Sequence, residues 1–394
     1  MDEALVTGFS AAGVVAGIKK KSKKELGLIV SERPAAVAGV FTRNRVQAAP
    51  VVVSRACVAR GACRALIVNS GNANCCTGQR GLADARQMAQ LTAEALGVAA
   101  DDVLVASTGV IGEPLPLERI AAALPILAQA LSPRGFNDLA EAIMTTDTVP
   151  KLVLERVASD QGAFSILGVA KGAGMIHPDM ATMLAFVCSD AEIEAPLLQQ
   201  MLADGVSRTF NRITIDGDTS TNDMAIVMAN GMSGVKIGDA ERQVLFQTAL
   251  DKVLGELAKA LVRDGEGATK LVEIVVCRAA TTAEAHQVAN TVATSPLVKT
   301  ALFGEDANWG RILAAAGRAG VAFDPELVEI RFDQVTIYAN GTGQGKAVEA
   351  QATSVLKQPA YTITIDLGQG EASDRIFTCD LSVDYIRINA DYRT

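Results

Sequence analysis

Residues 171–190, KGAGMIHPDMATMLAFVCSD, lie near the middle of this chain of 394 residues, and the rest of the sequence is best interpreted outward from them. Glycines interrupt the first part of the stretch, whereas the apolar run from Met183 to Val187 has the length of a core strand. Thr182 therefore stands where a glycine-rich loop enters a buried strand. Such a strand is a rigid support for one reactive side chain.

The Ala181–Thr182 step has two interpretations. In the first, Thr182 is an ordinary residue at the edge of a strand. In the second, its hydroxyl attacks the carbonyl of Ala181, the resulting ester is hydrolysed, and Thr182 becomes a new N-terminus. The freed α-amine, with an unperturbed pKa of roughly 7.7 to 8.0, could then act as the base for its own hydroxyl. These residues alone leave both interpretations open.

Length and composition predict a soluble enzyme with more than one domain. A chain of 394 residues exceeds the usual size of a single core, and 49% of its residues are hydrophobic and 20% charged. The net charge of −8, without an evident basic face, argues against nucleic acid as a partner. The basic run at residues 19–24, KKKSKK, is interpreted as the solvated tip of a hairpin.

The sequence gives no sign of a membrane partner or an oxidising compartment. It contains no run of eighteen apolar residues, and its start, MDEALVTGF, lacks the basic region of a signal peptide. The seven cysteines show no CxxC or zinc-ligand spacing, which favours reduced thiols. A cytoplasmic location is therefore expected.

Hydrophobic periodicity predicts both strands and helices. Apolar stretches, including residues 49–53, predict a mostly β opening over residues 5–58, and alternation predicts a strand-rich end that includes residues 377–388. Helical spacing predicts helices at residues 82–96, 117–131 (broken at Pro125), 137–144 (with Asn137 as its N-cap), 195–210 and 240–262.

Four polar or glycine-rich segments could line a site, although each also has an ordinary structural interpretation. They are NSGNAN at residues 69–74, STGVIG at 107–112, TTDT at 145–148 and ITIDGDTSTND at 213–223. Glycine in the second segment would let the backbone approach a ligand closely. The acidic fourth segment lacks the spacing of a calcium loop, so no metal is expected. The first segment receives no specific role, and the fourth is interpreted as hydrogen-bonding support.

The stretch KGAGMIHPDMATML, residues 171–184, resembles the autoproteolysis and nucleophile motif of the ornithine acetyltransferase family, also called glutamate N-acetyltransferase, of the arginine pathway. The similarity extends from VNSGNAN at residues 68–74 to the end of the chain. It implies an N-terminal-nucleophile-like layered α/β sandwich at residues 1–280 and a smaller strand-rich C-terminal domain at 281–394. It also implies self-cleavage between Ala181 and Thr182, and a heterotetramer of two 1–181 and two 182–394 chains.

The resemblance assigns roles to individual positions. It implies that Thr182 is the nucleophile and that Thr108 and Gly109 form the oxyanion hole. In the family, the matching lysine lines the site, where Lys171 could hold a substrate carboxylate and keep the Thr182 amine neutral. Positions that match substrate contacts are Thr145, Lys171, Thr182, Glu266, Asn389 and Thr394, although Arg393 alters the family's usual tail. No metal or organic cofactor is required.

The implied reaction is a ping-pong transfer of acetyl from N2-acetyl-L-ornithine to L-glutamate through an acetyl-Thr182 ester. Whether acetyl-CoA is a second donor stays open. The alternative is a self-cleaving amidohydrolase or aminopeptidase, in which water accepts the acyl group. A non-enzymatic binding module would keep the Ala181–Thr182 bond intact.

Overall fold

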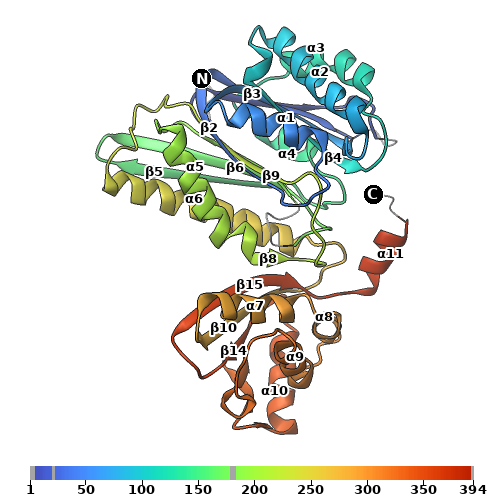
Figure 1. Ribbon diagram of the computed structural model, residues 1–394, viewed down its shortest axis with the longest axis vertical. Coiled ribbons are helices and arrows are strands. Elements are labelled where there is room, and N and C mark those ends of the chain that lie inside the picture. Colours follow the sequence, from blue (N-terminus) through green and yellow to red (C-terminus); the bar gives the residue numbers. More distant parts are fainter. Residues whose placement is uncertain (1–4, 20–22, 178–182, 392–394) are drawn as a thin grey trace. The chain divides into compact units, whose positions relative to one another are not determined.

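The computed structural model describes residues 5–19, 23–177 and 183–391, which divide into two compact units (Figure 1). Unit 1 comprises the described residues up to Asn211 and those from Asp218 to Leu261. Unit 2 comprises Arg212–Gly217 and the described residues from Val262 onward. Over the described residues, the chain therefore passes from one unit to the other three times.

The units divide at Leu261/Val262, whereas the sequence analysis places its boundary at residues 280/281. The reason is strand β10 (Leu271–Ala279), which pairs with β14 (Ala360–Asp366) in parallel and with β15 (Ala372–Cys379) in antiparallel orientation. Because β10 lies between two strands of the C-terminal sheet, residues 262–280 belong to the C-terminal unit.

Unit 1 is built on an eight-stranded sheet with the order β4-β3-β2-β9-β7-β6-β5, in which β1 also pairs with β2. The strands are β1 (Phe9–Val14), β2 (Leu26–Phe41), β3 (Ala62–Asn72), β4 (Val103–Val110), β5 (Lys151–Ser159), β6 (Gly162–Lys171), β7 (Leu184–Ser189) and β9 (Met224–Ala229). The helices are α1 (Ala49–Val58), α2 (Gly78–Leu96), α3 (Leu117–Gln129), α4 (Phe136–Ala142), α5 (Ala195–Arg208) and α6 (Ala240–Arg263).

Helices cover both faces of this sheet. Along β3, Ala65 and Ile67 pack in one core cluster with α2 and α3, whereas Leu66 and Val68 pack in another with α4. This division follows from the alternation of side chains along a strand. All residues of the central strands β7 and β9 are buried. A strand that is covered on both faces tolerates only a continuous apolar run, which is the pattern of residues 183–187.

Unit 2 has a seven-stranded sheet with the order β13-β12-β11-β14-β10-β15-β8. Its further strands are β8 (Ile213–Thr214), β11 (Glu329–Phe332), β12 (Val335–Ala339) and β13 (Thr342–Gly343). Its helices are α7 (Thr282–Ala293), α8 (Pro296–Phe303), α9 (Trp309–Gly317), α10 (Lys346–Leu356) and α11 (Val383–Asp391). The mixed α/β class with a strand-rich C-terminal unit is thereby confirmed.

Two segments that were expected to be strands form helices. Residues 49–53 begin α1, where Pro50 occupies the first turn and the buried positions Val51, Ser54 and Cys57 recur at helical spacing. The expected strand at 377–388 ends as β15 at Cys379, and α11 follows. The Ser382 hydroxyl accepts a hydrogen bond from the Tyr385 amide and thus favours the start of this helix. A short apolar run does not distinguish a strand from a buried helix.

Helix ends also depart from expectation. Helix α3 continues through Pro125 instead of breaking there. Gly135, not Asn137, precedes the first turn of α4, and no side chain caps it. Helix α2, by contrast, ends at Leu96, the predicted last residue, and Gly97 follows it in the left-handed conformation with φ of 68°.

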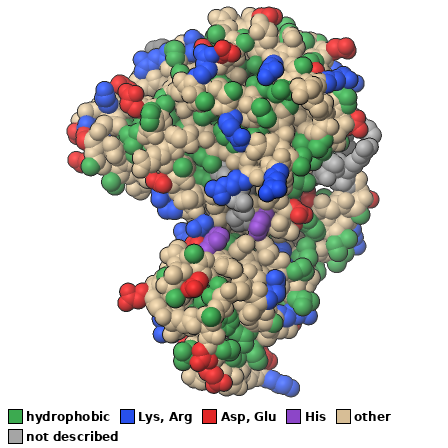
Figure 2. Space-filling view, viewed as in Figure 1, with side chains coloured by type: hydrophobic (Ala, Val, Ile, Leu, Met, Phe, Trp, Pro, Cys, Tyr) green, Lys and Arg blue, Asp and Glu red, His purple; other side chains and the backbone are tan. Residues whose placement is uncertain are grey.

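Charged side chains of both signs are distributed over the surface of the described residues. Figure 2 shows acidic and basic side chains interspersed over each unit on the face drawn. Within the described ranges, no helix is both long and apolar enough to cross a membrane. Nor do three or more His, Cys, Asp or Glu side chains gather there in a way that could hold a metal ion. The seven cysteines are free.

Candidate active site

The Thr108–Gly109 turn lies at the end of β4, against the parallel strand β3. Thr108 is paired with Ser70, and Gly109 with Gly71. Gly109 has φ of 133°, and a Cβ at this position would lie 2.3 Å from the carbonyl carbon of Gly71. Only glycine fits here, because any side chain would overlap the neighbouring backbone. The turn is therefore held at a fixed and close distance from β3.

Lys171 brings a positive charge to this turn. It ends β6, its residue is only 8% exposed, and its Nζ lies 3.3 Å from Thr108 Oγ1. A lysine ammonium has no acceptor capacity, so it donates and the threonine oxygen accepts. The hydroxyl proton of Thr108 is consequently left available for a second acceptor. Two of the predicted site residues are thus in contact.

Thr145 and Asp147 lie in the TTDT turn, residues 145–148. The Asp147 side chain is fully buried and forms an ion pair of 2.8 Å with Lys151. Its carboxylate also accepts hydrogen bonds from the amides of Gly172, at 2.7 Å, and Thr145, at 3.0 Å. Asp147 therefore connects the TTDT turn, which contains Thr145, to the glycine loop that follows Lys171.

The charges around Asp147 determine its ionisation. Burial would raise the pKa of this carboxyl, but Lys171, Lys151 and the backbone donor at Thr145 together hold the pKa at about 2, below the ordinary value of 3.8. The carboxylate is therefore ionised throughout the physiological range. It provides the negative charge that lets two lysines remain buried at the site.

Two of the polar segments, 69–74 and 213–223, support the Thr108 turn through hydrogen bonds. Asn69 accepts a hydrogen bond of 2.6 Å from the Ser107 hydroxyl. Asn222, from the segment 213–223, donates to the carbonyl oxygens of Ala73 and Ser107 at 2.6 and 2.8 Å. The buried amide of Asn222 thus joins the two strands beside the turn. Hydrogen-bonding support from the segment 213–223 was expected, but its partners could not be named from the sequence, because Ala73 and Ser107 lie more than 100 positions from Asn222.

Replacing Asn222 with alanine is expected to lower the free energy of unfolding by about 2–3 kcal/mol, since two buried carbonyl groups would lose their donor. Asn137→Ala is a matched control, because Asn137 is exposed on α4 and should change stability by less than about 0.5 kcal/mol. Urea denaturation of both variants measures the difference. Equal stability of the two variants would contradict the supporting role of Asn222.

Glu266 and Asn389 come together in unit 2. Asn389, on α11, donates a hydrogen bond of 2.7 Å to Glu266 Oε2. The loop that carries Glu266 is held against the start of α11, because Ser382 donates to the carbonyl of Gly267 and Asp380 accepts from the amide of Thr269. The structure therefore joins this pair of predicted substrate contacts. The predicted positions Ala181, Thr182 and Thr394 lie outside the described residues.

A cavity of about 440 Å³ in unit 1 adjoins the TTDT turn. Its walls are formed by Val15, Lys19, Lys23, Lys24, Glu141, Met144, Thr145 and Asp147. We call it the lysine cavity. Lys19 is half-buried, so the expectation that the basic run is a fully solvated hairpin tip is wrong for this residue. The strands on either side, β1 and β2, do pair as an antiparallel hairpin.

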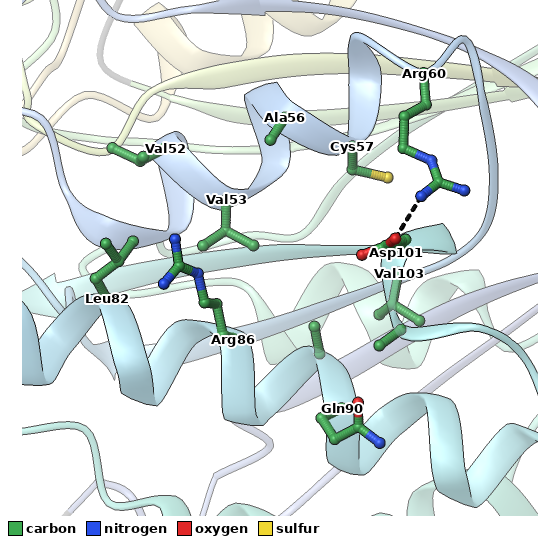
Figure 3. A pocket seen from close by; sticks show the side chains of 12 residues that line it. Val52, Val53, Ala56, Cys57, Arg60, Leu82, Arg86, Gln90, Asp101 and Val103 are labelled. Carbon is green, nitrogen blue, oxygen red and sulfur yellow. Dashed lines mark hydrogen bonds and ion pairs between the residues drawn. The ribbon is translucent and has the colours of Figure 1, made fainter.

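A second hollow, of about 420 Å³, lies between α1 and α2 (Figure 3). Val52, Val53, Ala56 and Leu82 give it apolar walls, and an ion pair between Arg60 and Asp101 lies at one end. It contains none of the predicted site residues. Of these two hollows, the lysine cavity shares a residue, Thr145, with the predicted site.

Comparisons with known proteins show the family of this chain. The model of the ArgJ family matches residues 10–394. The arginine biosynthesis bifunctional protein ArgJ of Syntrophotalea carbinolica is 52% identical over 391 residues, which cover 99% of each chain. The protein of the same name from Geobacter sulfurreducens is 49% identical over 391 residues, covering 99% of this chain and 100% of the relative.

A solved structure is also similar. The crystal structure of the arginine biosynthesis bifunctional protein ArgJ from Bacillus halodurans is 42% identical, covers 54% of this chain and 100% of the solved chain, and has a TM-score of 0.51. The fold, the site and these relatives define an acyltransferase of arginine biosynthesis. The chain belongs to the ArgJ family, which confirms the resemblance found in its sequence.

Proposed function

We propose that this enzyme transfers acetyl from N2-acetyl-L-ornithine to L-glutamate through an acetyl ester on Thr182. The chain first cleaves itself between Ala181 and Thr182. The freed Thr182 amine then takes the proton of its own hydroxyl, the hydroxyl oxygen attacks the acetyl carbonyl, and ornithine leaves with the proton. Glutamate enters with its amine, takes the acetyl group and restores the hydroxyl.

The observation that carries this proposal is the contact between Lys171 and Thr108 beside Gly109. Because Lys171 donates to the Thr108 oxygen, the Thr108 proton is free to point at the oxygen of a tetrahedral intermediate. The positive charge behind this hydroxyl makes it a better donor as negative charge develops on that oxygen.

The remaining site residues are proposed to bind different parts of the two amino-acid substrates. We assign Thr145 and Lys171 to groups near the acetylated end, and Glu266, Asn389 and Thr394 to the rest of the substrate. The carboxylate of Glu266 suits the side-chain ammonium of ornithine. The curated relatives are called bifunctional, so the proposal includes acetyl-CoA as a second acetyl donor.

The proposal extends to assembly and location. The fragments 1–181 and 182–394 remain associated, and two copies of each form a heterotetramer. Each fragment supplies residues of the site, which requires the association. Seven free cysteines fit the reducing environment of the cytoplasm, where we place the enzyme.

Thr182→Ala is expected to remain a single chain of 41.0 kDa under denaturing conditions and to lose acetyl transfer entirely, because the variant lacks the attacking hydroxyl. The wild type should give two fragments whose junction lies between Ala181 and Thr182. Intact mass spectrometry measures both, and N2-acetyl-ornithine should add one acetyl group to the second wild-type fragment.

Thr182→Ser is the matched control, since it keeps a hydroxyl and should still cleave. Uncut wild type with full transferase activity would disprove the amine as the base. Release of acetate at the same rate with and without glutamate would instead support the amidohydrolase alternative.

A further inference from the structure

The lysine cavity carries more positive charge than two amino-acid substrates require. Lys24 is neutralised by ion pairs with Asp138 and Glu141. Lys23, in contrast, is exposed and forms no hydrogen bond or ion pair within the described residues. The acidic groups of the wall are occupied, because Glu141 pairs with Lys24 and Asp147 pairs with Lys151. Lys19 and Lys23 therefore provide the charge that faces the cavity.

Lys19 connects this cavity to the oxyanion turn. Its Nζ donates a hydrogen bond of 2.7 Å to the carbonyl of Met144, which directly precedes Thr145. Its stem lies over Gly71, where a Cβ would come within 2.9 Å of Lys19 Cγ. Gly71 is the partner of Gly109 in the parallel strand pair. Lys19, in the inner wall of the cavity, thus contacts Gly71, which in turn pairs with Gly109 of the proposed oxyanion hole.

The environment of Lys19 is costly for a cation without an anionic ligand. Burial, together with the charges of Lys171 and Lys23, lowers the pKa of Lys19 to about 8, although the carboxylates of Glu25 and Asp147 oppose this. The Glu25 carboxylate is itself engaged, because its Oε1 accepts a hydrogen bond of 2.7 Å from the amide of Ile18. An anion in the cavity would stabilise the protonated lysine.

The chemistry of this wall selects among the candidate substrates. The side-chain ammonium of ornithine would be repelled by Lys19 and Lys23. A phosphate group is a strong acceptor with more than one negative charge, and lysine binds it well as a point charge. The volume of about 440 Å³ lies in the ordinary range for small-molecule sites, roughly 300–1,000 Å³.

We infer that the lysine cavity binds the phosphate-bearing part of a phosphorylated acetyl thioester such as acetyl-CoA, whose acetyl end reaches the oxyanion turn past Thr145. The inference rests on the proposed acetyl transfer through Thr182. In that step the C–S bond of the thioester breaks, a C–O bond to Thr182 forms, and the hydroxyl proton passes through the Thr182 amine to the thiolate, giving free CoA. No further reactant is needed.

The test compares ligands that share a thiol arm but differ in phosphates. Dissociation constants of CoA, 3′-dephospho-CoA and pantetheine are measured by isothermal titration calorimetry on wild type. CoA is expected to bind about tenfold more tightly than pantetheine, with 3′-dephospho-CoA in between, and sodium chloride should reduce the difference because it screens exposed charges. Equal affinity for CoA and pantetheine would overturn the inference.

Variants then locate the phosphate contact. Lys23→Ala should raise the dissociation constant of CoA about fivefold, which is the effect expected from losing one exposed ion pair of about 1 kcal/mol. Lys23→Glu should raise it further, because a carboxylate would repel the phosphate. Both should leave the value for pantetheine within twofold. Lys236→Ala, a lysine of unit 1 that lies outside the cavity and pairs with Glu192, is the matched control and should leave the value for CoA within twofold. An unchanged CoA affinity in both Lys23 variants would overturn the assignment.

Separate assays distinguish this inference from the proposed function. Acetyl transfer from N2-acetyl-ornithine to glutamate is measured on the same preparations. If wild type binds CoA as expected but does not transfer acetyl from N2-acetyl-ornithine to glutamate, the proposed function is refuted, whereas the phosphate site is still supported. A higher KM for glutamate in Lys23→Ala, without a change for CoA, would assign the cavity to the side-chain carboxylate of glutamate and overturn the inference.

Discussion

Asp147→Asn is expected to destabilise unit 1 by about 3–5 kcal/mol, because it removes the negative charge that compensates the buried ammonium of Lys151. The same change should lower acetyl transfer, since the carboxylate holds the amides of Thr145 and Gly172 in place. Equilibrium unfolding in urea at pH 7 measures the first effect. Asp138→Asn is the control, because Asp138 pairs with Lys24 at the surface and should cost less than about 1 kcal/mol.

The stability of the wild type should depend on pH through the same group. The folded pKa of Asp147 is about 2, below its ordinary value of 3.8, so its contribution is fully present above pH 4 and is lost as the pH falls toward 2. Two pKa units correspond to about 2–3 kcal/mol. The difference between wild type and Asp147→Asn should therefore shrink between pH 4 and pH 2. A constant difference over this window would show that the carboxylate charge is not the cause.

Gly109→Ala should reduce acetyl transfer by about 10²- to 10³-fold, the effect of losing one oxyanion donor. The added methyl group would lie 2.3 Å from the Gly71 carbonyl carbon, and φ of 133° is unfavourable for alanine, so the turn must move away from β3. Initial rates with N2-acetyl-ornithine and glutamate measure the loss, with circular dichroism to verify folding.

Gly112→Ala separates backbone strain from displacement of the turn. Gly112 also has positive φ, 86°, but nothing lies within 4 Å of a Cβ there. Strain alone should cost about 1 kcal/mol of stability and leave the rate within about threefold. If Gly109→Ala and Gly112→Ala have similar rates, the close contact with Gly71 does not position the oxyanion hole.

The sequence predicted those features that depend on neighbouring residues. The apolar run at 183–187 forms the buried strand β7, and helical spacing located α5 and α6 nearly to their ends. Residues 49–53 were misassigned because a short apolar run buried on one side of a helix has no period that distinguishes it from a strand. Tertiary packing, which α1 makes through Val51 and Cys57, determined the outcome.

The sequence pointed to individual residues of the candidate site, but it did not predict the hydrogen bonds and ion pairs between them. The TTDT segment pointed to Thr145, whereas the buried carboxylate of Asp147 carries the contacts to Lys151 and Gly172. Nothing in the local sequence reveals such burial, because Gly172 lies 25 positions from Asp147. A signal was present in the pairing of Asp147 with Lys151 four residues later. Lys19 was overlooked because a basic run usually faces solvent.

The strand order of unit 1 determines what the proposed cut does to the molecule. From edge to edge, β4, β3 and β2 precede residue 181 in the chain, β9 and β7 follow it, and β6 and β5 precede it again. The fragment 182–394 thus supplies two middle strands, β9 and β7, of a continuous hydrogen-bonded sheet, and the fragment 1–181 supplies the strands on both sides. Pulling the fragments apart would open two rows of backbone hydrogen bonds and the apolar layers that cover them. The two fragments within unit 1 should therefore unfold together in one cooperative step, and isotope-labelled fragments mixed with unlabelled enzyme should not exchange partners without denaturant.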